Sequence, residues 1–306
     1  MLRYRNLALF LVLAAVWGSA FMAINAGLAY FPPVLFAALR YDVAAVIMMA
    51  YAWYVVDDPV PRGRGEWTLV AIGATLLIAA YHVFLFVGES DPAVTSAIAA
   101  VIVSLSPVLT TVFARALLPS ERLTAIGVVG LVVGLVGAVV LAAPDPANLT
   151  GDGTVAKFLV FLAATAFGLG AVLTRAVDAE LPIETMEAWS MALGAVIMHV
   201  VALGLGESMG EIVWTTEALL ALAYLSIAAS AVGFLIYFDL LERLGPIEIN
   251  LVSYVAPVFA ALSGWVFLNE GLTLSTVVGF LLICVGFALV KRAAIRDELR
   301  RRGVSA

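Results

Sequence analysis

Two charged side chains lie inside a stretch of the chain that is otherwise apolar. Arg40 and Asp42 stand in residues 34–55, which follow a pair of prolines. If the stretch is a membrane helix that begins at Pro33, Arg40 lies about 10 Å from its start. An arginine there costs about 2.5–3.5 kcal/mol unless it faces water or a partner. Arg40 therefore fits a counter-charge for an anionic group such as a carboxylate, or a gate ion pair. Snorkelling to the headgroups is the structural alternative.

Asp42 needs a partner other than Arg40. Two residues correspond to about 200° around a helix, so the two side chains face apart. Asp42 either titrates and couples a conformational change to protons, or makes a buried structural hydrogen bond to another helix. His82 titrates near neutral pH and suits a proton relay, although a lone histidine is more often a satisfied core side chain. Asp42 and His82 are the candidate proton-coupling residues.

Polar and aromatic side chains within the apolar runs are candidates for lining a binding cavity. The best placed are the serines just before Pro107, and Ser253 before Pro257. A helical proline removes an N–H and disturbs the carbonyl four residues back, so the carbonyls of Val103 and Ser253 are expected to be free for a solute or water. A modest kink whose carbonyls are bonded by local serines is the alternative. With Pro107 and Pro257 as helix breaks, the candidate substrate-binding residues are Trp17, Asn25, Arg40, Tyr81, Ser104, Ser106, Tyr237, Asn250, Ser253 and Tyr254.

No cofactor, metal or catalytic group is expected. The histidines show no metal-binding spacing such as HExxH, and Cys284, the only cysteine, is expected as a small core side chain. The glycines of residues 123–143 recur every three or four residues, which predicts close helix packing or a homodimer and no phosphate loop. Without a nucleotide-binding fingerprint, direct ATP drive is not expected.

The elements that carry these residues are membrane helices. The chain of 306 residues is 64% hydrophobic and 12% charged, with a mean hydropathy of +1.10, which excludes a water-soluble globule. Ten continuously apolar runs are long enough to cross a bilayer, and they do not alternate as barrel strands do. The predicted fold is an all-α integral membrane protein with ten transmembrane helices, at 7–29, 34–55, 67–88, 93–116, 123–143, 155–175, 185–204, 217–240, 247–268 and 272–290.

The first run has the basic start and apolar stretch of a secretory signal peptide, with a small-residue site at residues 18–20. Its apolar stretch continues to Ala29, which is too long for a typical signal peptide. We therefore expect a retained first helix.

Basic residues accumulate on alternate connections, on one side of the ten runs. By the positive-inside rule this predicts that both termini are cytoplasmic, in a cell membrane. The acidic opposite loops fit either ordinary outer loops or a high-salt host. The basic residues after 290 are expected to contact anionic lipid headgroups, and no nucleic acid is expected as a partner. Glu89 is expected to be interfacial. Three other acids near run ends are expected as solvated helix ends, with a gate role as the alternative: Glu187, Asp239 and Glu248.

The chain contains a duplication. "PVLTTVFARALLPSE" at residues 107–121 matches "PVFAALSGWVFLNE" at 257–270, and the following Leu-Thr pair and glycines match at a shift of 149. Trp17-Gly18 matches Phe167-Gly168 at a shift of 150. The repeats are therefore residues 1–146 and 147–306, each with five runs. Because five is odd, the second repeat enters the membrane from the opposite side, as in secondary transporters that work by alternating access. The two acids, Glu121 and Glu270, are interpreted as markers of helix ends.

"AAVWGSAFMAI" in the first run, "PPVLFAALRY" before the second, and the two Pro-to-Glu modules resemble the EamA-type members of the drug/metabolite transporter superfamily. The resemblance covers both halves. It implies a ten-helix transporter with a central cavity, substrates among amino acids, other metabolites and drugs, and frequently export. The chain departs from the family pattern at Phe167, at the extra residue before Glu121, and at "FVGESDP".

The sequence thus predicts a secondary transporter of a small metabolite, amino acid or drug-like solute, with proton coupling as one means of driving it. An intramembrane enzyme is the second hypothesis, and it lacks a local nucleophile–base or metal motif. A receptor or channel is the third, and the inverted duplication disfavours it.

Overall fold

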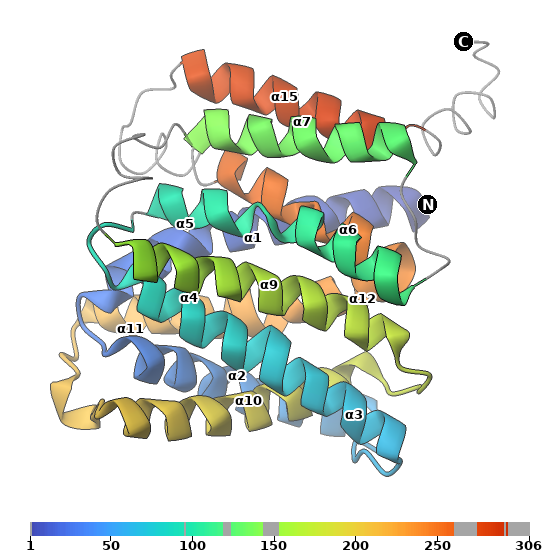
Figure 1. The fold of residues 1–306 in the computed structure, drawn as a ribbon. Helices are drawn as coiled ribbons and strands as arrows, with labels where there is room; N and C mark the ends of the chain where they lie inside the picture. Colours follow the sequence, from blue (N-terminus) through green and yellow to red (C-terminus); the bar gives the residue numbers. More distant parts are fainter. Residues whose placement is uncertain are drawn as a thin grey trace.

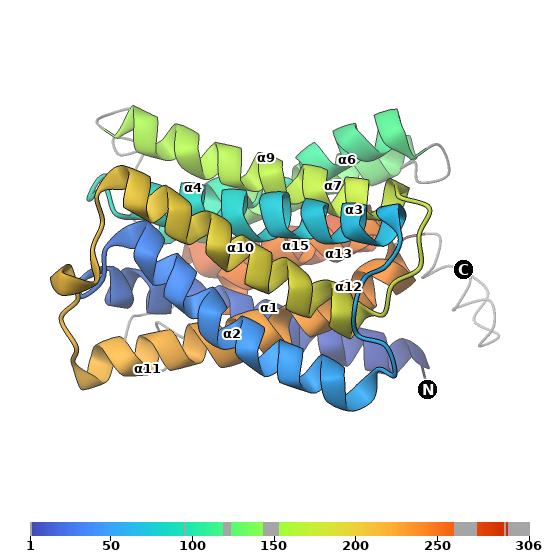
Figure 2. The ribbon, with the colours of Figure 1, turned by 90° about the horizontal axis from the view of Figure 1, so that it is seen from below.

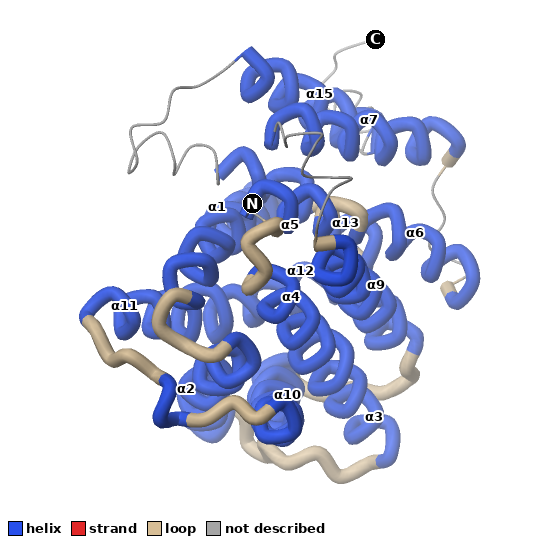
Figure 3. Tube along the Cα trace, turned by 60° about the vertical axis from the view of Figure 1, so that its left-hand side comes forward, coloured by secondary structure: helices blue, strands red, loops and turns tan. Residues whose placement is uncertain are grey.

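The computed structural model describes residues 2–94, 96–118, 124–142, 153–259, 274–290 and 292. All regular elements in these residues are helices, as the tube in Figure 3 shows. Within these described residues, seven helices are long and apolar enough to cross a membrane: Arg5–Leu28, Pro33–Val55, Arg64–Glu89, Ile98–Leu117, Thr154–Ala176, Ile183–Leu205 and Thr216–Leu244. Shorter apolar helices lie at Ala125–Val140, Pro246–Phe259 and Val277–Val290. The all-helical membrane fold is therefore confirmed.

The first half of the chain begins with two long helices, α1 (Leu2–Leu28) and α2 (Pro33–Val55). The next long helix is continuous but changes its winding, from α3 (Arg64–Ile72) through η1 (Gly73–Ala80) to α4 (Tyr81–Glu89). Then come α5 (Ser96–Val103), α6 (Ser106–Leu117) and α7 (Ala125–Ala142).

The second half has the same order of elements. It comprises α9 (Thr154–Ala176), α10 (Ile183–Leu205), the short η2 (Met209–Glu211), and a long helix made of α11 (Thr216–Tyr224), η3 (Leu225–Val232) and α12 (Gly233–Leu244). It continues with α13 (Pro246–Asn250), a helix at residues 252–259, and α15 (Leu274–Val290). Most predicted run ends lie within four residues of these helices. The exceptions are the start of α1 and the run 247–268, whose second part lies outside the described residues.

The π-helical segments η1 and η3 occupy the middle of the third helix of each half. A π-helix inserts extra residues into the turn and loosens the regular i to i−4 hydrogen bonding, and such segments recur at functional sites. Apolar runs of this kind give no sequence signal for a π segment, so the sequence predicted ordinary helix here.

The helices pack through small residues that bring backbones close together. In Figures 1 and 2, α2 lies along α10, and α4 lies along α9. A Cβ added to Gly88 of α4 would meet Val160 and the carbonyl of Ala156 in α9, and one added to Gly194 of α10 would meet Ile78 in η1. Larger residues at these positions would force the helices apart.

The pair α7 and α15 packs together at one edge of the bundle (Figure 1). A Cβ on Gly130 would lie 2.7 Å from the carbonyl oxygen of Gly286, and one on Gly137 would lie 2.9 Å from that of Gly279. The glycine stripe is therefore used within the chain, so a homodimer would need a different face.

Several predictions about single side chains are corrected. Glu187 is 0% exposed, so it is buried rather than a solvated helix end, and Glu89, the last residue of α4, is 4% exposed. Cys284 is exposed on α15 rather than a core side chain. Asp239 does lie at a helix end, paired with Arg243 and Arg5 at 2.6 and 3.8 Å. Glu121, Glu270 and the basic chain after residue 292 lie outside the described residues.

Candidate functional site

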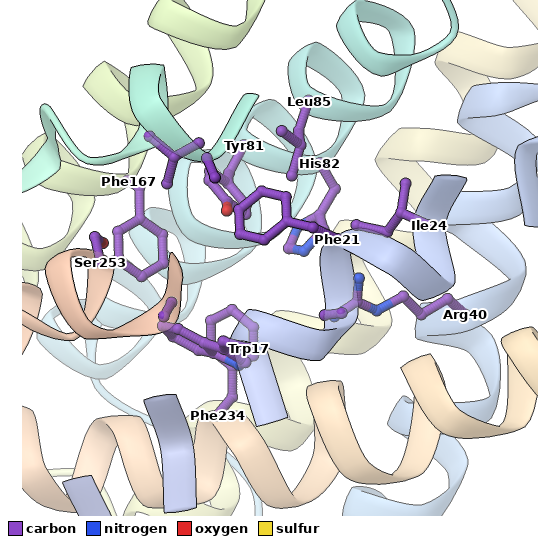
Figure 4. Close-up of a pocket in the computed structure, with 14 residues that line it drawn as sticks. Trp17, Phe21, Ile24, Arg40, Tyr81, His82, Leu85, Phe167, Phe234 and Ser253 are labelled. Carbon is purple, nitrogen blue, oxygen red and sulfur yellow. The ribbon is translucent and has the colours of Figure 1, made fainter. Parts of the chain in front are cut away.

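A cavity of about 50 Å³ lies in the middle of the bundle (Figure 4). It is enclosed by α1, α2, α4, α5, α9, α12 and the helix at 252–259. Only Trp17 and Tyr81 of its walls are more than marginally exposed. The lining residues are Trp17, Ala20, Phe21, Ile24, Arg40, Tyr81, His82, Leu85, Ala100, Val103, Phe167, Phe234, Ser253 and Ala256. The cavity is thus lined mainly by buried residues, is mostly apolar, and is drawn from both halves.

Trp17 is the centre of an aromatic cluster on one side of this cavity. Its ring centroid lies 5.7 Å from that of Phe167 and 5.3 Å from those of Phe234 and Tyr237. Its indole Nε1–H donates a 3.1 Å hydrogen bond to the carbonyl of Ala229. Ala229 belongs to η3, where the π winding leaves a carbonyl available to an outside donor.

Arg40 brings a charge to the opposite side from Phe167 and Ser253 (Figure 4). The residue is 3% exposed, and its Nε donates a 2.6 Å hydrogen bond to Ser230 Oγ, again in η3. Its Cζ lies 5.2 Å from the ring centroid of Tyr41. In the described part of the chain no carboxylate forms an ion pair with Arg40, which leaves a buried cation beside the cavity.

His82 lines the cavity together with Arg40 and is linked to α2 by a hydrogen bond. Its Nδ1 is 2.8 Å from the carbonyl oxygen of Ile78, which can only accept, so Nδ1 carries the hydrogen. In the neutral ring Nε2 is then an acceptor, and the hydroxyl of Tyr41 donates to it across 3.0 Å. His82 therefore sits in the cavity wall with both ring nitrogens hydrogen-bonded.

Asp42 does not line the cavity. Its Oδ2 lies 2.7 Å from Nε2 of His199 on α10, and the two side chains are 42% and 32% exposed. The separate partner that Asp42 was expected to need is therefore His199. The pair links α2 to α10 on the outside of the bundle.

The expectation of free carbonyls before the prolines is corrected. The carbonyl of Ser253 accepts a 3.1 Å hydrogen bond from Ser104 Oγ, a residue of the other half. The first helix interruption lies at Ser104–Leu105, just before Pro107, but the second lies at Leu251, six residues before Pro257. Pro257 itself lies within the helix at 252–259, so it does not end it.

The remaining predicted residues lie outside the cavity lining, and three of them bond other parts of the bundle. Asn250 donates from Nδ2 to Thr110 Oγ1 at 2.8 Å and accepts from the hydroxyl of Tyr237 at 3.2 Å. Tyr254 donates to the carbonyl of Leu131 at 2.9 Å. Ser106 is buried, and Asn25 is exposed on α1. Of the predicted substrate-binding set, the structure brings together Trp17, Arg40, Tyr81 and Ser253 at the cavity, with the proton-coupling candidate His82.

Sequence reasoning missed the apolar part of the wall. Phe21, Ile24, Leu85 and Phe234 look like any other core residue in an apolar run, and no spacing distinguishes them. Phe167 did carry a signal, since it is the counterpart of Trp17 in the repeat.

The helix that carries Arg40 is held at its start by Glu207. The two carboxylate oxygens of Glu207 accept from the backbone N–H groups of Val34 and Leu35, at 3.1 and 2.6 Å. These are free N–H groups at a helix N-terminus, where a negative charge is stabilising. Glu207 lies in the second half and α2 in the first, so this contact fixes one half against the other.

Comparison with known proteins identifies the family. A model of the "EamA-like transporter family" matches twice, over residues 5–143 and 154–292. The chain belongs to the EamA-like transporter family. This membership makes it a multi-span membrane protein of a transporter family, and not an enzyme.

Relatives of this EamA-like transporter span nearly the same length. It is 25% identical to the uncharacterized transporter YoaV of Bacillus subtilis over 89% of this chain and 91% of that one. It is 28% identical to the uncharacterized inner membrane transporter YedA of Escherichia coli, over 94% and 92%. It is 27% identical to Protein PecM of Dickeya dadantii, also over 94% and 92%.

A solved crystal structure has the same fold, with a TM-score of 0.79 over 96% of this chain and 99% of the other, at 23% identity. At that identity the likeness concerns the fold alone.

Replacing Glu207 by Ala should lower the thermal midpoint of the purified transporter in detergent. The change removes both acceptors from the first turn of α2, a loss of about 0.5–2 kcal/mol. Glu211→Ala is the matched control, because Glu211 lies on the same connection with an exposed side chain. Equal midpoints for the two variants would contradict the capping role.

Proposed function

We propose that this EamA-like transporter is a secondary active transporter that moves a small amphipathic solute through the central cavity. The observation that carries this proposal is the central cavity with aromatic walls and a buried cation, Arg40. A cavity in the middle of a membrane bundle, with an apolar wall and a few polar groups, suits the binding site of a secondary transporter.

The solute is proposed to carry an anionic group, such as the carboxylate of an amino acid or another metabolite. Arg40 would bind that group, because a guanidinium presents paired donors that match a carboxylate. The rings of Trp17, Phe167 and Phe234 would contact the apolar part of the solute. Drug-like aromatic acids fit the same description.

Alternating access between two inverted five-helix repeats, at residues 1–146 and 147–306, is the proposed mechanism. Contacts between equivalent residues support a two-fold relation: Trp17 meets Phe167, and Ser104 bonds Ser253, at shifts of 150 and 149. The same two-fold relation exchanges two further contacts. Gly130 approaches Gly286, and the equivalent contact is that of Gly137 with Gly279. Two halves that can exchange conformations would open one site to opposite faces in turn.

The π segments are proposed as the places where the long helices bend during this exchange. They lie at corresponding positions of the two halves, and η3 bonds both Trp17 and Arg40. Movement at η3 would therefore displace Trp17 and Arg40, the residues proposed to contact the solute.

Export across the cell membrane, with both termini in the cytoplasm, completes the proposal. Its support is the excess of arginine at the end of the bundle that holds Arg5, Arg62 and Arg243, together with the resemblance to exporters. A ten-helix count rests on the seven long helices plus the three shorter apolar ones.

Flux into proteoliposomes tests the transport proposal. We expect wild-type protein to exchange at least one solute from a panel of radiolabelled amino acids and simple aromatic carboxylates. Arg40→Gln should reduce that exchange about 10- to 100-fold, because a hydrogen bond to a charged group contributes about 1.5–3 kcal/mol.

Arg62→Gln is the matched control, since the Arg62 guanidinium is 75% exposed and pairs with Asp58 at the bundle end. Size-exclusion profiles confirm that both variants are folded. If Arg40→Gln exchanged the solute at the wild-type rate, Arg40 would not bind it; if hydrolysis of a panel solute occurred without flux, the transporter proposal would fail.

Proton coupling through Asp42 and His82 is the remaining part of the proposal. Its support is that adjacent residues of α2 each contact a histidine: Tyr41 contacts His82, and Asp42 contacts His199. Both contacts join α2 to an ionisable side chain on another helix, so a change of protonation at either one would alter how α2 is held.

Asp42→Asn should abolish accumulation driven by a pH gradient while leaving exchange without a gradient intact. Asp58→Asn, which removes a carboxylate at the exposed end of the bundle, should leave both activities unchanged. Accumulation by Asp42→Asn at the wild-type level would remove Asp42 from the coupling mechanism.

A further inference from the structure

Two buried carboxylates have no hydrogen-bond partner among the described residues, and the proposed function uses neither. They are Glu89, the last residue of α4, and Glu187, in the second turn of α10. Glu187 lies on α10, which packs against α2 and α12, two of the helices that line the cavity, and it carries the inference.

Glu187 is enclosed on every side. It is 0% exposed, and neither carboxylate oxygen has a partner in the described part of the chain. Its helix packs against α2, α3, η1 and α12. A backbone donor, the N–H of Leu235 in α12, lies near the carboxylate without making a hydrogen bond to it. An ionised carboxylate left unpaired in such a place costs several kcal/mol, whereas the protonated acid costs far less.

The charges around Glu187 do not supply the missing partner. The titratable and charged side chains on its own helix and on the elements packed against it are Arg40, Tyr41, Asp42, Tyr51 and Tyr54 of α2; Arg64 and Glu66 of α3; Glu184 and His199 of α10; and Tyr237, Asp239, Glu242 and Arg243 of α12. Of these, Glu184 and Tyr41 act on Glu187 electrostatically. Glu184 is an acid and Tyr41 is neutral, so neither favours a charged Glu187.

We propose that Glu187 carries a proton in this closed arrangement and releases it to water when the contact between α10 and α12 opens. The step transfers one proton from the carboxyl group to solvent and leaves a hydrated carboxylate, and closing the contact requires the proton to return. The inference rests on the proposed function, because it adds this proton to the Asp42 and His82 contacts as a further group tied to alternating access.

Glu187 is connected to the substrate cavity through Tyr41. Tyr41 is fully buried, is electrostatically coupled to both Glu187 and Arg40, and donates to His82 in the cavity wall. Leu235 follows the end of η3 by three residues, so bending at η3 would move α12 against Glu187. A change at the solute site and the opening of the Glu187 pocket therefore share the same moving elements.

The protonation of Glu187 can be measured without any solute. Infrared difference spectra of the protein in lipid nanodiscs, recorded on raising the pH, should contain the carbonyl band of a buried protonated carboxylic acid. The band should be lost in Glu187→Gln and kept in Glu184→Gln, whose changed side chain lies one turn away on the same helix. A wild-type spectrum without a band that depends on Glu187 would overturn the proposal.

The role of this proton in transport is read from proteoliposomes with the panel solute that wild-type protein exchanges. One coupled proton supports about tenfold accumulation per pH unit of gradient. Glu187→Gln should lose this accumulation while its exchange without a gradient stays within about twofold of wild type, and Glu184→Gln should keep both. Equal losses of accumulation and exchange would assign Glu187 a structural role and overturn the proposal.

Glu187→Asp distinguishes the loss of the acid from a folding defect, because it keeps a carboxyl group on a shorter side chain. It should retain gradient-driven accumulation with a shifted pH profile, and a pH profile identical to that of wild type would count against the proposal. If no panel solute is exchanged by wild-type protein, the proposed function fails, and the infrared band still decides whether Glu187 holds the proton.

Discussion

Hydrocarbon offers no hydrogen bonds, so each polar group that this chain places inside the membrane has to find a partner within the protein. Within each helix the backbone N–H and C=O groups bond one another. Some backbone carbonyls also accept a hydrogen bond from a side chain of the other half. Ser104 donates to the carbonyl of Ser253, and Trp17 donates to the carbonyl of Ala229 in η3. Arg40 and Glu187 are buried and lack a counter-charge among the described residues: Nε of Arg40 bonds only the neutral Ser230, and the carboxylate of Glu187 has no hydrogen-bond partner. To these two groups we assign binding and coupling.

The same constraint explains how much of the fold the sequence could predict. Continuous apolar runs and flanking polar connections place the helices well, because length and hydropathy decide whether a segment crosses a bilayer. They say nothing about winding: η1 and η3 have the composition of ordinary helix. The helix interruption near Pro257 was predicted at the proline but lies at Leu251, because the residues before Pro257 stay helical.

Site residues were predicted best where the chemistry is costly in a membrane. Arg40 and His82 stood out by charge, and both line the cavity. Three other predicted residues are polar but form hydrogen bonds within the bundle instead of lining the cavity: Asn250, Tyr237 and Tyr254. Only three-dimensional contacts distinguish a residue that lines the cavity from one that bonds another helix. Glu187 was assigned to a solvated helix end because it lies one turn from the start of its helix; lateral packing by α2 and α12, which the sequence does not encode locally, buries it.

The central claim is that two related halves open the cavity to opposite ends in turn, and equivalent contacts at the two ends make it measurable. At one end Gly65 approaches Asp178 and Ala179; at the other Val213 donates to the carbonyl of Tyr30. After Cys284→Ser removes the only cysteine, spin labels can be placed at Arg62 and Asp178 in one sample and at Ala29 and Val213 in another.

Double electron–electron resonance then measures each distance in nanodiscs. The account predicts two populations for each pair, with conditions that lengthen one distance shortening the other. A single unchanging distance in both samples, or lengthening of both together, would contradict it.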